Sequence, residues 1–103
     1  MRLFGPPPQN EQITTWWQGN IAAATWASRN VSSVSENAQA DITITFQRVY
    51  RATPAVIISV GLATNDNGYL TALTSSSVRI LAANSSGTST PSRNSGVIVT
   101  GLV

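Results

Sequence analysis

The stretch of residues 41–62, DITITFQRVYRATPAVIISVGL, constrains the fold more than any other part of the chain. Apolar and polar residues alternate strictly from Ile42 to Phe46, which is typical of a strand with one buried face. Pro54 then forces the residue before it into an extended conformation and marks a turn. Residues 55–62 are apolar and β-branched almost throughout, and this predicts a strand covered on both faces.

Turn signals divide the rest of the chain into further short strands. Asn67-Gly68 is a strong hairpin signal, and we expect it to join the strand that ends near Leu62 to a strand at residues 69–74. The other expected strands are residues 13–26 with a bend at Gly19-Asn20, an alternating strand at 78–82 and a last strand at 97–103, and residues 31–34 are a candidate for a short edge strand in addition. About six strands joined by short turns predict an all-β fold, a small six-stranded antiparallel β-sandwich.

The chain of 103 residues supports a single domain of this kind. We expect an extended N-terminal arm at residues 1–12 and the β-sandwich domain at residues 13–103. The arm carries Phe4 followed by Pro6, Pro7 and Pro8, which favour an extended polyproline segment. Two interpretations stay open: the arm docks on a neighbouring subunit, or it is a frayed terminus.

Two adjacent tryptophans, Trp16 and Trp17, point to opposite faces if they lie on a strand. One is then a core residue, and the other faces a partner or a ligand. Packing in the core or between subunits is the favoured role for both, because large aromatic side chains dominate cores and interfaces. The predicted arm and oligomer contacts are Phe4, Pro6, Pro7, Pro8, Trp16 and Trp17.

Composition removes several classes of chemistry. The chain has no Cys and no His, so it lacks thiolates, the commonest general base and the commonest metal ligand. Its four acidic residues form no recognisable motif. We therefore expect no enzyme activity, no catalytic residue, no metal site and no cofactor.

Charge is also sparse. Charged residues make up 10% of the chain, against about a quarter in a typical domain. Such a surface is either largely covered by other subunits or solvated by hydroxyls and amides. Only Arg48 and Arg51 lie close together among the basic residues, so we expect no nucleic-acid partner. The longest apolar run is too short for a membrane-spanning helix, so we expect no membrane association.

Three segments together resemble the H-type lectin fold and related small domains of bacteriophage fibres and other virion appendages. They are Trp17-Gln18-Gly19-Asn20-Ile21, then Ile44-Thr45-Phe46 with Tyr50 and Thr53-Pro54-Ala55-Val56-Ile57, and the closing strand at 96–102. The resemblance covers most of residues 16–103. It implies a six-stranded antiparallel sandwich and a homotrimer.

The sugar site of that family is not matched by this chain. The family uses an Arg on the strand after the central hairpin and a Trp-His pair in the loop before the last strand. Here residues 69–72 contain no Arg, and residues 87–94 contain no aromatic side chain. The resemblance therefore implies fold and trimer, and does not imply the family's lectin chemistry.

Two functions follow as hypotheses. The first is a homotrimeric, non-enzymatic structural subunit of a phage-like virion surface, a head-decoration or tail-appendage protein assembled in the host cytoplasm and held to other virion proteins by its arm. The second is a carbohydrate-binding module for host attachment, whose partner is a cell-surface glycan. Its candidate ligand-binding residues are Asn65, Asp66, Asn67, Tyr69, Arg79, Arg93 and Asn94.

A simpler interpretation of those polar residues is favoured. Residues 65–68 then form only a turn, which needs no ligand to explain it. Arg79 and Arg93 are then solvated or paired with Asp41 or Glu36.

Overall fold

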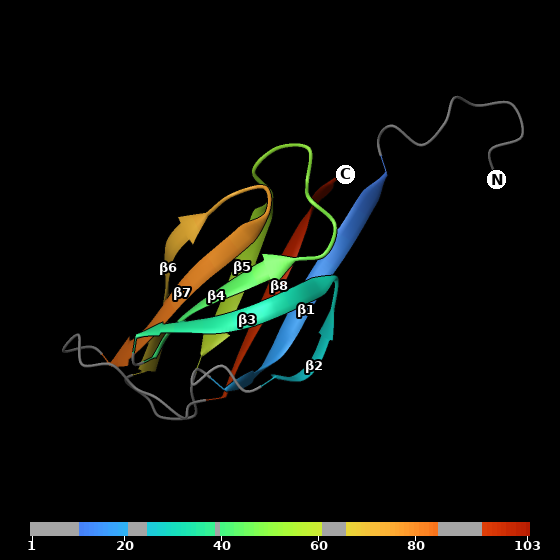
Figure 1. Cartoon of the computed structure of the whole chain (residues 1–103). Coiled ribbons are helices and arrows are strands. Elements are labelled where there is room, and N and C mark those ends of the chain that lie inside the picture. Colours follow the sequence, from blue (N-terminus) through green and yellow to red (C-terminus); the bar gives the residue numbers. More distant parts are fainter. Residues whose placement is uncertain (1–10, 21–24, 39, 61–65, 85–93) are drawn as a thin grey trace, which may run out of the picture.

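The computed structural model describes residues 11–20, 25–38, 40–60, 66–84 and 94–103. These residues form an all-β structure of two antiparallel sheets that pack face to face, as expected for a β-sandwich (Figure 1). The strands are β1 (Gln12–Asn20), β2 (Thr25–Arg29), β3 (Val31–Ala38), β4 (Asp41–Phe46), β5 (Ala55–Val60), β6 (Asp66–Leu73), β7 (Ser77–Asn84) and β8 (Asn94–Leu102).

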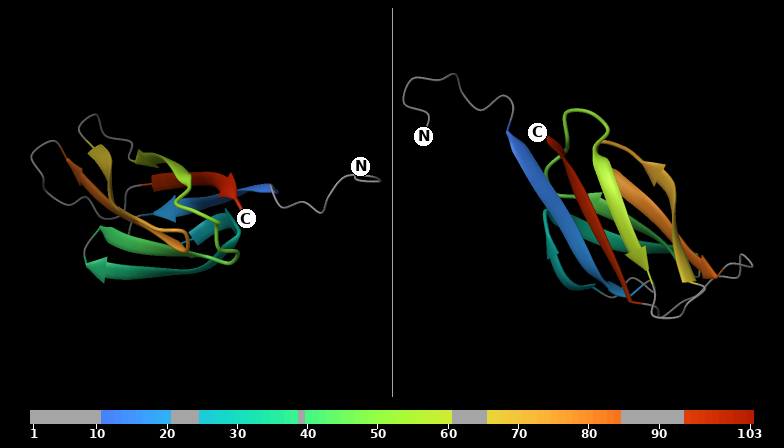
Figure 2. Two further views of the ribbon diagram at one scale, coloured as in Figure 1. Left: turned by 90° about the horizontal axis from the view of Figure 1, so that it is seen from above. Right: turned by 180° about the vertical axis from the view of Figure 1, so that it is seen from behind.

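Each sheet has four strands. Sheet A has the order β2-β1-β8-β5, and sheet B has the order β3-β4-β7-β6. The two layers are seen from above in the left view of Figure 2, and β1, β8 and β5 lie side by side in the right view. The last strand, β8, is therefore central in sheet A, and the main-chain N–H of Val103 donates to the carbonyl of Glu11 at 2.9 Å.

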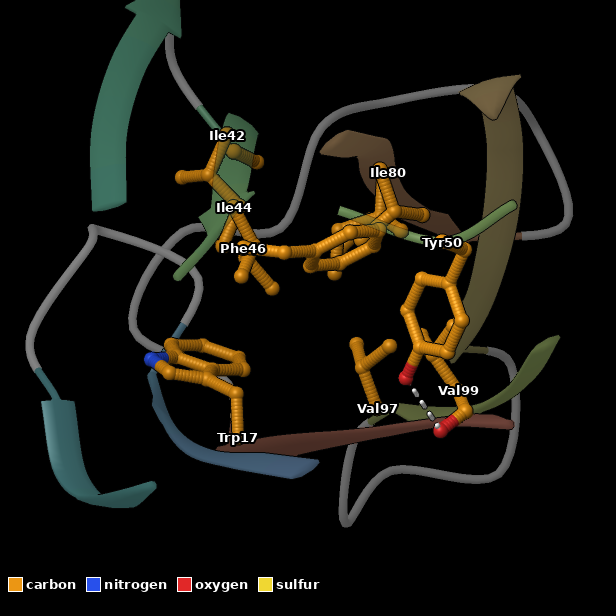
Figure 3. Close-up of a cluster of buried hydrophobic side chains, with 11 residues drawn as sticks. Trp17, Ile42, Ile44, Phe46, Tyr50, Ile80, Val97 and Val99 are labelled. Carbon is orange, nitrogen blue, oxygen red and sulfur yellow. Dashed lines mark hydrogen bonds between the residues drawn. The ribbon is translucent and has the colours of Figure 1, made fainter. Parts of the chain in front are cut away.

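The core lies between the inner faces of the two sheets (Figure 3). The alternation predicted from Ile42 to Phe46 is confirmed, since the apolar side chains of β4 are buried and the polar ones are partly exposed. The β7 alternation is confirmed as well, with Val78, Ile80 and Ala82 fully buried. Sheet A contributes Trp17, Val97 and Val99.

The segment between β4 and β5 is anchored to the core by Tyr50. Its ring meets Phe46 edge-on, with centroids 5.4 Å apart and an interplanar angle of 89°. The Tyr50 hydroxyl lies 2.6 Å from Thr15 Oγ1 and donates to the Val99 carbonyl at 3.2 Å. Gly101 allows this packing, because a Cβ there would lie 2.9 Å from Tyr50 Cδ1 and 3.1 Å from Pro54 Cβ.

This close approach predicts the effect of a single methyl group. We expect Gly101→Ala to lower the free energy of unfolding by about 1–3 kcal/mol, because the added methyl overpacks the buried ring of Tyr50. Urea denaturation measures the loss. Gly96→Ala is the matched control, since a Cβ there meets only the Trp17 carbonyl oxygen at an ordinary 3.7 Å. Equal midpoints for the two variants would contradict the prediction.

Two expectations from the sequence concern strand number and the arm. The described residues form eight strands where about six were expected, because β1 and the start of β2 both fall in the stretch at 13–26 and the candidate edge strand at 31–34 forms as the longer β3. Gln12, assigned to the arm, is the first residue of β1. Residues 1–10 lie outside the described residues.

The expected hairpin at Asn67-Gly68 is wrong. Both residues lie within β6, where they pair with Ala83 and Ala82 of β7. The turn prediction fails because β5 and β6 belong to different sheets, so no tight turn can connect them. Pairing with β7 over its whole length extends β6 back to Asp66.

The expectation of a strand covered on both faces at residues 55–62 is also wrong for the single chain over the described part, residues 55–60. β5 is an edge strand of sheet A, and Ile57 is 68% exposed. Val56 and Ile58 turn inward and are partly buried. An apolar residue on the outer side of an edge strand gains no burial within this chain.

Candidate functional site

The outer face of sheet A carries an apolar row across three strands. Strand register places Trp16 of β1 opposite Ile98 of β8, and Ile98 opposite Ile57 of β5. Ile98 is 49% exposed, Ile57 is 68% exposed and Trp16 is partly buried. Directly opposite residues share a face of the sheet, so the three side chains form one continuous strip.

The neighbouring rows of this face are uncharged. Thr14, Thr100 and Ala55 form one row, and Gln18, Gly96 and Ser59 form the other. Together the three rows make up what we call the sheet A face. Contiguous exposed apolar surface rimmed by polar residues marks interaction sites in soluble proteins. This face is therefore suited to contact with another molecule.

A groove of about 920 Å³ opens beside the first half of β1. It forms because β2 pairs with β1 only from Trp16 onward, which leaves residues 11–15 without a partner strand on that side among the described residues. We call it the β1 groove. Its lining comes from β1, the end of β2 and the segment after β4: Glu11, Gln12, Ile13, Thr14, Trp16, Arg29, Asn30, Gln47 and Arg48.

Asn30 joins the walls of this groove. Its φ of 61° is left-handed, a conformation that Asn tolerates better than most residues. Its side-chain amide donates to Thr15 Oγ1 at 2.7 Å, and its side-chain oxygen accepts from the Arg48 main-chain N–H at 2.6 Å. Thr15 in turn contacts the Tyr50 hydroxyl. The groove walls are thus tied to the core by a hydrogen-bonded network.

Charged groups stand at the rim of the groove. Arg48 contacts Glu11 at 3.3 Å, with about half of each side chain exposed, and a pair of this kind contributes about 0–1 kcal/mol. Arg29 lies opposite Trp16 in the strand register, and its side chain makes no hydrogen bond or ion pair within the described residues. Arg29 therefore adds an uncompensated positive charge beside the indole.

Among the seven residues predicted as a ligand site, the structure describes the side chains of two, Tyr69 and Arg79, which lie on paired strands of sheet B. Tyr69 is 44% exposed on β6, and Arg79 lies on β7 of sheet B, whereas Asn94 begins β8 of sheet A. Asp66 and Asn67 lie on β6, and only their backbone is described. Asn65 and Arg93 lie outside the described residues, as do the arm residues Phe4, Pro6, Pro7 and Pro8.

The side chains of Trp16 and Trp17 point to opposite faces of β1, as predicted. Trp17 is 1% exposed and lies within the core of its own chain, where its Nε1–H donates to Thr25 Oγ1 at 2.8 Å. Trp16 points to the opposite face. Only Trp16 of the two therefore has surface available to a partner or a ligand.

Arg79 is held by Asp41, as the simpler interpretation of the sequence proposes. Its Nε and Nη2 donate to the two carboxylate oxygens at 2.9 and 2.7 Å, and Asn37 Nδ2 donates to Asp41 Oδ1 at 3.2 Å. The hydrogen bond from Arg79 lowers the pKa of Asp41 below its ordinary value of 3.8 and raises that of Arg79. Arg79 thus has a structural partner.

This ion pair predicts a pH dependence of stability. Because the pKa of Asp41 is lowered in the folded state, the pair stabilises the fold above pH 3.8 and is lost as pH falls through the folded pKa. We expect Asp41→Asn to be less stable than wild type near neutral pH, and the difference to shrink in acid. Urea midpoints between about pH 7 and pH 2 measure this difference. A pH-independent difference, like that expected for the neighbouring Ser35→Ala, would contradict the prediction.

The β1 groove could not be predicted from the sequence. Its residues come from three segments that are distant in the sequence, and no spacing or motif connects them. Arg48 and Arg51 are close together in the sequence, but only Arg48 lines the groove. Arg51 turns elsewhere, since its Nη2 donates to the carbonyl of Val103 at 3.3 Å.

A scan against protein-family models matches no family, and searches of curated proteins and of solved structures find no match. Among the described residues, no three Asp, Glu, His or Cys side chains gather in a way that could hold a metal ion. The same residues include no helix long and apolar enough to cross a membrane.

Proposed function

We propose that this chain is a non-enzymatic structural subunit that assembles with copies of itself on a phage-like virion surface, as a homotrimeric head-decoration or tail-appendage protein. The observation that carries the self-association is the sheet A face, which has Trp16, Ile98 and Ile57 at its centre and one charged neighbour, Arg29, beside Trp16. The virion setting and the trimer rest on the resemblance of the sequence to virion-appendage domains. In this setting the arm holds the subunit to other virion proteins.

The composition of β5 supports self-association most directly. This edge strand carries apolar residues on both sides, with Val56 and Ile58 directed inward and Ala55 and Ile57 outward beside Ser59. An outer face that stays in water usually alternates to polar residues. Burying a large aliphatic side chain contributes about 1.5–3 kcal/mol, so covering Ile57 and Ile98 favours the binding of a second copy.

The experiment is sedimentation of the full chain over a wide concentration range, with the melting temperature recorded on the same samples. We expect a trimer and a melting temperature that rises with protein concentration, because association stabilises the folded state by mass action. A monomer at every concentration with a constant melting temperature would refute the assembly.

The β1 groove favours carbohydrate binding as a second candidate function. An indole, two arginines and the side-chain amides of Gln12 and Gln47 line one recess, and these groups offer a stacking surface with donors and acceptors for hydroxyls. This site differs from the polar residues that the sequence suggested. Thr14 and Trp16 belong to both surfaces, so a contact between copies that covers Trp16 and a sugar packed on Trp16 exclude each other.

A further inference from the structure

We propose that the β1 groove binds an acidic sugar, with Trp16 as the surface on which the ring packs and Arg29 as the partner of the sugar carboxylate. The inference rests on the second candidate function, carbohydrate binding, and names its ligand class. It does not depend on assembly through the sheet A face.

The size of the groove suits one or a few sugar rings. Its volume of about 920 Å³ lies within the range of roughly 300–1,000 Å³ that is usual for small-ligand sites. The lining mixes one large aromatic side chain with several polar ones. Sites of this composition bind ligands that have both an apolar face and many hydroxyl groups.

The position of Arg29 selects for an anion. Trp16 and Arg29 are directly opposite each other on neighbouring strands, which places their Cβ atoms about 4.5–5.5 Å apart on one face. A ring packed on the indole therefore lies within reach of the guanidinium. The guanidinium of Arg29 has no ion-pair partner among the described residues, and guanidinium groups bind carboxylates with two parallel hydrogen bonds.

The opposite wall supplies groups for hydroxyls. Arg48 and Glu11 form an exposed pair at 3.3 Å that water and ligands can reach, and Gln12 and Gln47 add amides that both donate and accept. Two arginines against one glutamate leave the lining with a net positive charge. A neutral sugar uses these hydroxyl contacts, and an acidic sugar gains the arginine contact as well.

The groove is held in shape before any ligand binds. The Asn30 side chain connects Thr15 on β1 with the backbone of Arg48, and the Gln47 main-chain N–H donates to the Asn30 carbonyl at 2.9 Å. The left-handed backbone of Asn30 is stabilised by these contacts. A preorganised site loses less entropy on binding than one that must be ordered by the ligand.

The same edge of β1 is too short to bind a peptide by strand addition. The main-chain carbonyl of Glu11 points toward β8, where it accepts from Val103. The direction of the main-chain groups alternates along a strand, so the N–H and C=O groups of Gln12 and Thr14 point away from β8, toward the groove. The next residue whose main-chain groups point away from β8 is Trp16, and it is already paired with Arg29 of β2. Two residues give too short a ladder for an added strand, whose affinity comes from main-chain hydrogen bonds.

The test is a titration of the ¹⁵N-labelled full chain, followed by NMR, with sialyllactose and a galacturonic acid tetramer as acidic probes. Lactose and the methyl-esterified tetramer are their neutral counterparts. We expect shifts at the indole N–H of Trp16 and the Nε–H of Arg29, and an affinity for at least one acidic probe about tenfold or more above its neutral counterpart. This preference should weaken as salt is added.

Matched variants assign the contacts. Arg29→Gln is expected to reduce the acidic probe's affinity about tenfold while leaving that of the neutral probe unchanged. Arg79→Gln removes the same charge from sheet B and should leave both affinities unchanged. Trp16→Ala should abolish the binding of both probes, whereas Trp26→Ala should not, because Trp26 does not line the groove. The spectra of the variants report directly whether each is folded.

Several outcomes would overturn the proposal. They are equal affinities for acidic and neutral probes, no shift with either acidic probe, and an Arg29→Gln variant that binds like wild type. Tighter binding of a glutamate-rich peptide at the same residues would instead identify a peptide groove. Sedimentation separates this test from the assembly test, since a monomer that binds acidic sugar refutes only the assembly.

Discussion

Replacing Trp17 with alanine is expected to lower the free energy of unfolding by about 3–5 kcal/mol. Trp17 is 1% exposed and is the largest of the fully buried side chains, facing Phe46 and Ile44 across the core (Figure 3). Its removal leaves a cavity and breaks the hydrogen bond to Thr25. A domain of 103 residues has about 5–15 kcal/mol of stability in total, so much of it is lost.

Chemical denaturation followed by circular dichroism measures this loss. Trp26→Ala is the matched control, because it removes the same side chain from a position that is 55% exposed on β2. We expect the control to cost less than about 1 kcal/mol. If both variants lost the same stability, the assignment of Trp17 to the core would be wrong.

Ile57→Lys is expected to dissociate the proposed assembly while leaving each chain folded. Ile57 is 68% exposed in the single chain, so a lysine there is readily solvated. In an interface formed by the sheet A face, the same lysine is a buried charge without a partner, which costs about 3–5 kcal/mol. The dissociation constant should therefore rise about 100-fold or more.

Sedimentation equilibrium measures the dissociation, and urea denaturation checks that the monomer is intact. Val49→Lys is the control, since Val49 is 57% exposed and lies on the segment after β4, away from the sheet A face. We expect Val49→Lys to assemble like wild type. An Ile57→Lys protein with the mass of the wild-type assembly would show that copies associate through another surface.

The fold class could be predicted because its signal is local. A strand that packs against a core on one side alternates apolar and polar residues, and the alternation of β4 and β7 is readable directly in the sequence. The same two-residue alternation places the side chains of Trp16 and Trp17 on opposite faces of β1. The last strand, expected at residues 97–103, is likewise present as β8.

The pairing of strands that are distant in the sequence could not be predicted in this way. The Asn67-Gly68 pair has the local preference for a tight turn, but pairing of β6 with β7 places it inside a strand. Long-range backbone pairing outweighs a turn preference because it satisfies many hydrogen bonds at once. The β1 groove depends in the same way on where β2 stops pairing with β1.

The sequence by itself determined an all-β chain with inward-facing rows on β4 and β7, because side-chain alternation is a property of each strand alone. Only the tertiary structure decided that apolar β5 is an edge strand with Ile57 exposed, and that Trp16, Arg29 and Arg48 share one groove. A continuous apolar run indicates that burial of both faces of the strand is favourable. It does not indicate whether the second face is covered by the same chain or by another molecule, because the covering depends on contacts between residues that are distant in the sequence.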